Sequence, residues 1–117
     1  MGPCKSGPEA EGHSAQGCDR ALVRALSFLG KRWTGVILAT LLQGPAGFSE
    51  LRRVVGGISD SVLAERLGEL AEAGLVTRRV EEGPPVSVQY GLTAAGAALL
   101  PAMRELTTWA AANLPRG

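Results

Sequence analysis

Apolar residues recur three or four positions apart from residue 19 onward, and this spacing predicts a series of helices. Asp19 can cap the first helix and Gly30 can end it. The apolar positions of this helix are Leu22, Ala25, Leu26 and Leu29. A second helix over residues 32–43 is apolar on nearly every side, which predicts a place at the centre of the fold, and Gly44-Pro45 ends it.

The next segment has the pattern of two helices joined by a glycine turn. A short helix is predicted over residues 48–55, and Gly56-Gly57 forms the turn. Ser59 can cap a longer helix that reaches about Ala73, where Gly74 stops it. The predicted buried stripe of the longer helix consists of Leu63, Leu67 and Leu70. Helix, turn and helix together form a helix-turn-helix.

After Gly74 the apolar period changes to two, which predicts strands. Strands over 75–81 and 86–92, joined by a loop that contains Pro84-Pro85, form a β-hairpin wing behind the helix-turn-helix. Thr93 can cap a last helix that reaches about Asn113, and Pro101 inside it predicts a kink. The predicted fold class is therefore α+β, mainly α: a winged helix-turn-helix with a two-stranded β-hairpin wing.

The composition sets the domain limits. A chain of 117 residues supplies one domain, predicted over residues 18–114, and residues 1–17 are predicted to form a flexible tail because they lack large apolar side chains. No segment approaches the roughly 18 consecutive apolar residues of a membrane helix, and no signal-peptide pattern is present. With only two cysteines, the default expectation is a reducing, cytoplasmic compartment.

Several ordered motifs resemble one family. They are LGKRW at residues 29–33, GISDSVLAERLGELAEAGLVTR at 57–78, PPVSVQYGLTAAG at 84–96, and Trp109 near the end. Together they resemble the HxlR family of bacterial winged-helix regulators, which are related to the MarR group. The chain departs from the family pattern at Gly47, where Arg is usual, and at Val86, where many members carry a basic residue.

The resemblance implies a transcription regulator that binds an inverted-repeat operator in double-stranded DNA. It also implies a homodimer whose terminal helices form the interface, a cytoplasmic protein that associates with the nucleoid when bound to DNA, and no cofactor. Leu22, Leu26, Leu106 and Trp109 are the candidate dimer residues. The alternative is that these four side chains close the core of a single subunit.

Candidate DNA contacts lie on the two motif helices and on the first wing strand. They are Arg52, Arg53, Ser59, Ser61, Val62, Glu65, Arg66, Arg78 and Arg79. Serine hydroxyls and a helix N-terminus bind phosphate, and the first turns of a recognition helix enter the major groove. Arg78 and Arg79 point to opposite faces of a strand, so only one can look straight outward.

Charge supports a competing interpretation of these arginines. The whole chain carries a formal charge of +1, but residues 48–82 hold five Arg against seven Asp and Glu. Each Arg can therefore form a surface ion pair with a nearby acid, worth about 0–1 kcal/mol. Together with Gly47 and Val86, this charge balance keeps open a second function, a winged-helix module for protein–protein contact without sequence-specific DNA binding.

Cys18 is the candidate redox sensor. It precedes the predicted cap at a helix N-terminus, where unpaired backbone donors favour the thiolate. The resemblance implies sensing of quinones, hypochlorite or disulfide stress at such a position, and a small-molecule effector or no sensory role are the alternatives. Cys4, His13 and Cys18 make a poor zinc site, so no metal is expected. No nucleophile–base set appears, so no enzyme is expected.

Overall fold

The computed structural model describes residues 18–116 of the chain, with side chains from Arg20 onward. The chain divides after Gly35 into two units. In the first unit, α1 runs from Cys18 to Leu29, so it begins one residue before the predicted cap Asp19. Gly30 follows it as predicted, and its backbone N donates to the Leu26 carbonyl at 2.8 Å.

Helix α2, Thr34–Leu41, is shorter at both ends than predicted. Trp33 before it has a φ of 79°, in the left-handed region that interrupts a right-handed helix. After it, the backbone N of Gln43 bonds back three residues to Thr40, which is a tightening turn. Its side chains Ile37, Leu38 and Leu41 are buried, which confirms the central place predicted for this helix, although Val36 is half exposed.

The helix-turn-helix consists of α3, Phe48–Val55, and α4, Asp60–Glu72. Ser59 caps α4 as predicted, because its Oγ accepts from the Val62 backbone N at 3.2 Å. Gly56 and Gly57 have φ values of 71° and 72°, so the turn requires residues without a Cβ. The predicted stripe on α4 is buried together with residues of the neighbouring segments: Leu51, Ile58, Leu63, Leu67 and Leu70.

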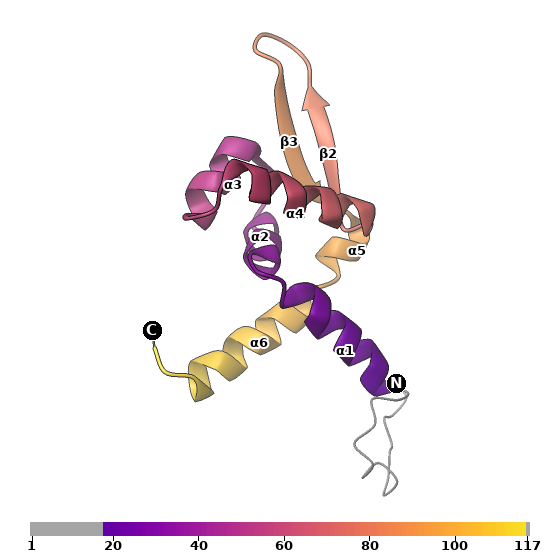
Figure 1. Cartoon of the computed structure of the whole chain (residues 1–117), viewed down its shortest axis with the longest axis vertical. Helices are drawn as coiled ribbons and strands as arrows, with labels where there is room; N and C mark the ends of the chain where they lie inside the picture. Colours follow the sequence, from indigo (N-terminus) through magenta and orange to yellow (C-terminus); the bar gives the residue numbers. More distant parts are fainter. Residues whose placement is uncertain (1–17, 117) are drawn as a thin grey trace, which may run out of the picture. The chain divides into compact units, whose positions relative to one another are not determined.

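The sheet contains the predicted hairpin and one further strand. Strands β2, Val76–Glu81, and β3, Ser87–Leu92, are antiparallel, and β1, Ala46–Gly47, pairs with the other edge of β3. Strand β1 is not predictable from the sequence pattern, because two residues are too few to show an alternation. The hairpin extends beyond α3 and α4 as a wing (Figure 1).

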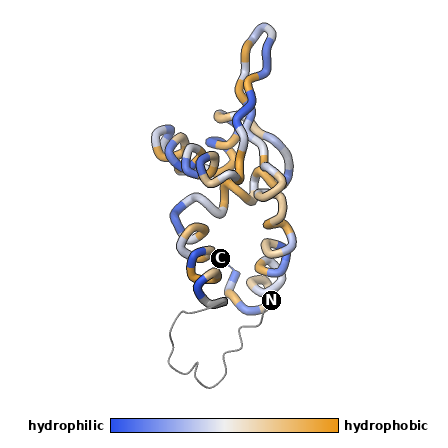
Figure 2. Tube along the Cα trace, turned by 90° about the vertical axis from the view of Figure 1, so that its right-hand side faces the viewer, coloured by the Kyte–Doolittle hydropathy of each residue, from blue (hydrophilic) through white to orange (hydrophobic). Residues whose placement is uncertain are grey.

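The register of the hairpin gives the sheet two faces. The front face carries the cross-strand pairs Val76–Leu92, Arg78–Tyr90 and Val80–Val88. The back face carries Thr77–Gly91, Arg79–Gln89 and Glu81–Ser87. Val76 is buried and β2 contacts α4, so the front face is the one that packs on the motif helices. Apolar residues gather where the base of the hairpin meets these helices (Figure 2).

An anchor formed by Gly74, Leu75, Thr93 and Gly96 holds the two ends of the hairpin together. The Thr93 hydroxyl donates to the Gly74 carbonyl at 2.7 Å, and the Gly96 backbone N donates to that hydroxyl at 3.1 Å. The Thr93 backbone N donates to the Leu75 carbonyl at 2.9 Å. One threonine therefore ties the segment that enters β2 to the segment that leaves β3.

The kinked C-terminal helix predicted around Pro101 is instead two helices. Helix α5, Ala94–Ala97, follows the cap Thr93, and α6 runs from Leu100 to Asn113. Pro101 lies in the first turn of α6, where a backbone N–H has no intrahelical acceptor and the fixed proline φ is suited to the helix. The chain thus ends one helix and starts another where the prediction placed a bend.

Two glycine substitutions test this account of the anchor. In Gly96→Ala the new Cβ would overlap the Leu75 carbonyl oxygen and lie 3.0 Å from Leu92 Cδ2. We expect the free energy of unfolding to fall by about 1–3 kcal/mol. Gly68→Ala in the exposed part of α4 meets no atom within 4 Å, and we expect a gain of about 0.5–1 kcal/mol. Urea denaturation of both variants measures the difference, and equal stabilities would contradict the packing at Gly96.

Candidate nucleic-acid interface

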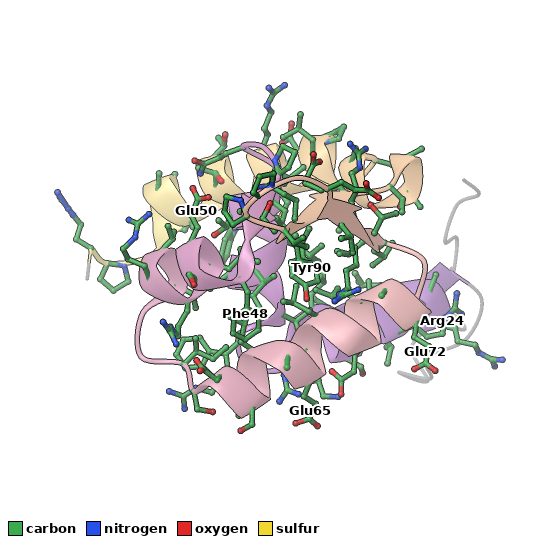
Figure 3. All side chains as sticks on the ribbon, turned by 90° about the horizontal axis from the view of Figure 1, so that it is seen from above. Arg24, Phe48, Glu50, Glu65, Glu72 and Tyr90 are labelled. Atoms are coloured by element: carbon green, nitrogen blue, oxygen red, sulfur yellow. The ribbon has the colours of Figure 1, made fainter. Side chains whose placement is uncertain are left out.

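The first turns of α4 form an exposed polar surface. Ser59, Ser61 and Glu65 are exposed, and Val62 is half-buried. The hydroxyls of Ser59 and Ser61 lie 3.4 Å apart at the start of the helix. Figure 3 shows Glu65 on the outer side of α4, whereas Tyr90 of the front face lies between the sheet and the motif helices. This surface offers hydroxyls, backbone N–H groups and one carboxylate to a partner.

Arg52 and Arg53 end α3 but have different surroundings. Arg52 Nη1 donates to Asp60 Oδ1 at 2.7 Å, so it joins the last turn of α3 to the first turn of α4. The two side chains are 47% and 62% exposed, and solvent therefore leaves the ion pair worth about 1 kcal/mol or less. Arg53 is exposed, and no ion pair of Arg53 is present within residues 18–116.

Arg66 faces two acids of its own helix. Its side chain is only 14% exposed, and Nη1 lies 3.4 Å from Glu69 Oε1 and 3.7 Å from Glu65 Oε2. A guanidinium in this position compensates the acids on α4 and is poorly placed to reach a phosphate. The geometry at Arg66 is the one that the ion-pair interpretation expects.

The two wing arginines lie on opposite faces of the sheet, as the strand period predicts. Arg78 is exposed on the front face beside Tyr90, on the side of the sheet that packs on α4. Arg79 lies on the back face, with Nη1 3.9 Å from Glu81 Oε2. The alternation of the strand is visible in the sequence, but which face meets α4 is not. That information comes from the burial of Val76.

The two positions that depart from the family pattern have clear places in the fold. Gly47 belongs to β1 and pairs with Gln89, and a Cβ there would lie 3.4 Å from the Val88 carbonyl oxygen. Val86 is 68% exposed at the end of the wing loop, and Val80 nearby on β2 is 49% exposed. The wing therefore carries exposed apolar side chains on both sides of its loop. The acids Glu81 and Glu82 come just before that loop in the sequence.

The candidate dimer residues are all exposed in the single chain. Leu22 and Leu26 lie one turn apart on α1 and are 57% and 59% exposed. Leu106 and Trp109 lie on α6 and are 53% and 54% exposed. Helix α6 contains no buried residue within the described part of the chain. The assignment of these four side chains to a dimer interface, or to the core of one subunit, stays a prediction.

The redox candidate Cys18 is the first residue of α1. Its side chain, Cys4 and His13 lie outside the described residues. Within residues 18–116, no three His, Cys, Asp or Glu side chains come together in an arrangement that could hold a metal ion. In the same part of the chain no helix has the length and apolar character needed to span a bilayer.

The capped recognition helix, the preceding helix and the β-hairpin define a winged helix-turn-helix protein. Comparison with known proteins makes this class more specific, because residues 28–117 match the HxlR-like helix-turn-helix family. The chain belongs to this family and is a transcriptional regulator of the HxlR type.

Both sequence and structure point to the same relative. The HTH-type transcriptional regulator YodB of Bacillus subtilis (strain 168) is 44% identical over 86 residues, which cover 74% of this chain and 77% of YodB. The reduced form of YodB superposes with a TM-score of 0.77 and 39% identity, covering 87% of this chain and 99% of that one. Quinone-bound YodB has a TM-score of 0.68 and 38% identity, covering 78% and 96%.

Proposed function

We propose that the protein binds an inverted-repeat operator in double-stranded DNA as a homodimer, with α4 in the major groove. The observation that supports the proposal is that two exposed arginines, Arg53 at the end of α3 and Arg78 on the front face of the wing, form no ion pair within residues 18–116 and flank α4 in the sequence. Phosphates flank the major groove on both sides, so cations beside a recognition helix suit a duplex.

Each exposed group on α4 has a plausible chemical partner in the groove. Hydroxyls of Ser59 and Ser61 donate to a phosphate or a base edge near the helix N-terminus. The Glu65 carboxylate accepts a hydrogen bond from the N4 amino group of cytosine, and Val62 offers an apolar contact to a thymine methyl. These contacts favour sites that place cytosine opposite the middle of the helix.

Charge limits the affinity of such an interface. Arg52 and Arg66 already face acids, and Glu81 and Glu82 bring negative charge to the wing. If Arg53 and Arg78 each neutralise one phosphate, a dimer neutralises about four, and the logarithm of the binding constant falls with the logarithm of salt at a slope of about −3.6. We therefore expect modest, salt-sensitive binding.

Single substitutions test the two proposed phosphate contacts, Arg53 and Arg78. Arg53→Gln and Arg78→Gln each remove two charges from a dimer, and we expect each salt slope to become shallower by about 2. Arg79→Gln on the back face is the matched control and should leave the slope unchanged. Fluorescence anisotropy with DNA from the protein's own promoter region, titrated between low and moderate salt, gives the slopes.

An unchanged slope in Arg53→Gln and Arg78→Gln would refute their phosphate contacts. If the wild-type protein shows no sequence-selective, salt-sensitive binding at all, the DNA proposal fails. The interpretation of the fold as a protein–protein module would then replace it.

We place the dimer interface on the exposed apolar residues of α1 and α6. Leu22 and Leu26 on one helix and Leu106 and Trp109 on the other supply apolar area that a single chain leaves in contact with water. A two-fold axis then presents two copies of α4 to half-sites about 34–36 Å apart, which is one turn of DNA.

Charge introduced on α6 tests the interface. Trp109→Glu buries a carboxylate in the proposed interface, so we expect sedimentation velocity to show a monomer and DNA affinity to fall by at least about tenfold. Leu114→Glu is the control, because Leu114 is equally exposed, at 53%, but lies after the end of α6. A Trp109→Glu protein that remains a dimer would exclude α6 from the interface.

We propose Cys18 as the site at which an electrophile or oxidant changes DNA binding. Two observations support this: Cys18 begins α1, a helix of the proposed interface, and the similar regulator YodB has been solved with quinone bound. A thiolate adds to a quinone ring carbon, and the ring is thereby reduced to a hydroquinone thioether. A bulky adduct at the start of α1 would alter how the two subunits meet.

Mass spectrometry and DNA binding test this assignment together. Treatment with benzoquinone should add one quinone to the wild-type chain at Cys18 and weaken its complex with DNA by about tenfold or more. Cys18→Ser should bind DNA normally and lose the response, and Cys4→Ser should keep it. A wild-type complex that survives modification of Cys18 would contradict the proposal.

A further inference from the structure

Two adjoining hollows open on the back face of the sheet. The smaller has a volume of about 150 Å³ and the larger about 390 Å³. Four residues line both of them: Pro45, Thr77, Arg79 and Gly91. The hollows therefore form one continuous groove, here called the back groove, on the opposite side of the sheet from the proposed DNA contact Arg78.

The two ends of the back groove differ in chemistry. The larger hollow has an apolar wall made by the end of α2, the residue after it, β3, α5 and α6: Leu41, Leu42, Leu92, Ala97 and Leu100. The smaller hollow is mostly polar, with Thr77, Arg79, Glu81 and Gln89 around it, and Tyr90 also lines it. Among the residues that line the larger hollow, Arg79 is the single charged one in the described part of the chain.

The groove stays open because β3 carries a glycine, Gly91, near its end. Gly91 lies opposite Thr77 and takes no side chain into the space between Arg79 and the apolar wall. A Cβ at this position would meet only Pro45, at 3.9 Å, so nothing in the packing requires glycine there. Glycine weakens a strand and is typical of sites where another group approaches the backbone closely.

Arg79 keeps most of its hydrogen-bonding capacity. Its nearest acid, Glu81, is at 3.9 Å, and the two side chains are 74% and 50% exposed, so this ion pair is weak. A guanidinium has five N–H donors in a planar fork, which matches a carboxylate in two parallel hydrogen bonds. Glu81 opposes an anion, but it lines only the smaller hollow.

We propose that the back groove binds a small amphipathic monocarboxylic acid. Its carboxylate pairs with the guanidinium of Arg79, and its hydrocarbon body lies over Gly91 against Leu42 and Leu100. Binding sites of this type combine an apolar wall with a few polar groups that fix the orientation of the ligand. This proposal is independent of DNA binding and of Cys18, because none of the proposed DNA contacts and no cysteine lines the groove.

Isothermal titration with octanoate, kept below its micelle concentration, tests the proposal on the full chain without DNA. We expect saturable binding with one site per chain. Acetate lacks the apolar body and 1-octanol lacks the charge, so neither should bind measurably. Binding of 1-octanol as strong as that of octanoate would overturn the role of Arg79, and no saturable octanoate binding would overturn the site.

Four variants locate the ligand. Arg79→Gln should weaken octanoate by about tenfold or more, because the charge-assisted pair is lost. Arg78→Gln, the neighbouring arginine on the front face, should leave the affinity within about twofold of the wild-type value. Gly91→Val should abolish binding by filling the groove, whereas Glu81→Gln should tighten it by a few-fold, roughly the effect of removing one partly exposed like charge.

Octanoate binding is expected to weaken in Arg79→Gln and to tighten in Glu81→Gln. Loss of the fold cannot explain both results, because it would weaken binding in every variant. Thermal melts of each variant verify the fold separately. Equal losses in Arg78→Gln and Arg79→Gln, in proteins that melt like the wild type, would overturn the proposal.

Discussion

The structure depends most on the hydroxyl of Thr93. It donates to the carbonyl of Gly74 and accepts from the backbone N of Gly96, so it closes the loop of chain that leaves α4 as β2 and returns as β3. Gly96 must lack a side chain for α5 to approach Leu75 closely enough. Because α4 and the wing are held at this one point, the positions of Arg78 and of the first turns of α4 are set together rather than independently.

In this protein the positions of the charged side chains matter more than the net charge. A chain with a formal charge of +1 has little long-range attraction for a phosphate backbone. Arg52 instead joins the two motif helices through Asp60, and Arg66 compensates the acids of α4. Arg53 and Arg78 form no ion pair within the described residues, and Arg79 lies on the back face. Side chains of one type, close in sequence, thus have different surroundings and different expected roles.

The sequence predicted the motif well because its signals are local. The bounds of α3, the Ser59 cap and the glycine turn each depend on residues within a few positions of one another. Features that depend on distant residues could not be predicted in this way: β1 exists only through its pairing with distant β3, and the break between α5 and α6 falls at Ala98 and Leu99, before Pro101. The candidate site shows the same limit, since the pairing of Arg52 with Asp60 requires the turn to bring them together.

The sheet order has a consequence for solubility. Strand β3 lies in the middle, and β2 has a neighbour on one side only, so its other edge presents backbone donors and acceptors to solvent within the described chain. Such edges recruit strands from other molecules and promote aggregation. Arg78, Arg79 and Glu81 place charged side chains along this edge, and charges there disfavour stacking of one wing on another. The wing arginines therefore protect the free protein from aggregation, whether or not they also bind a ligand.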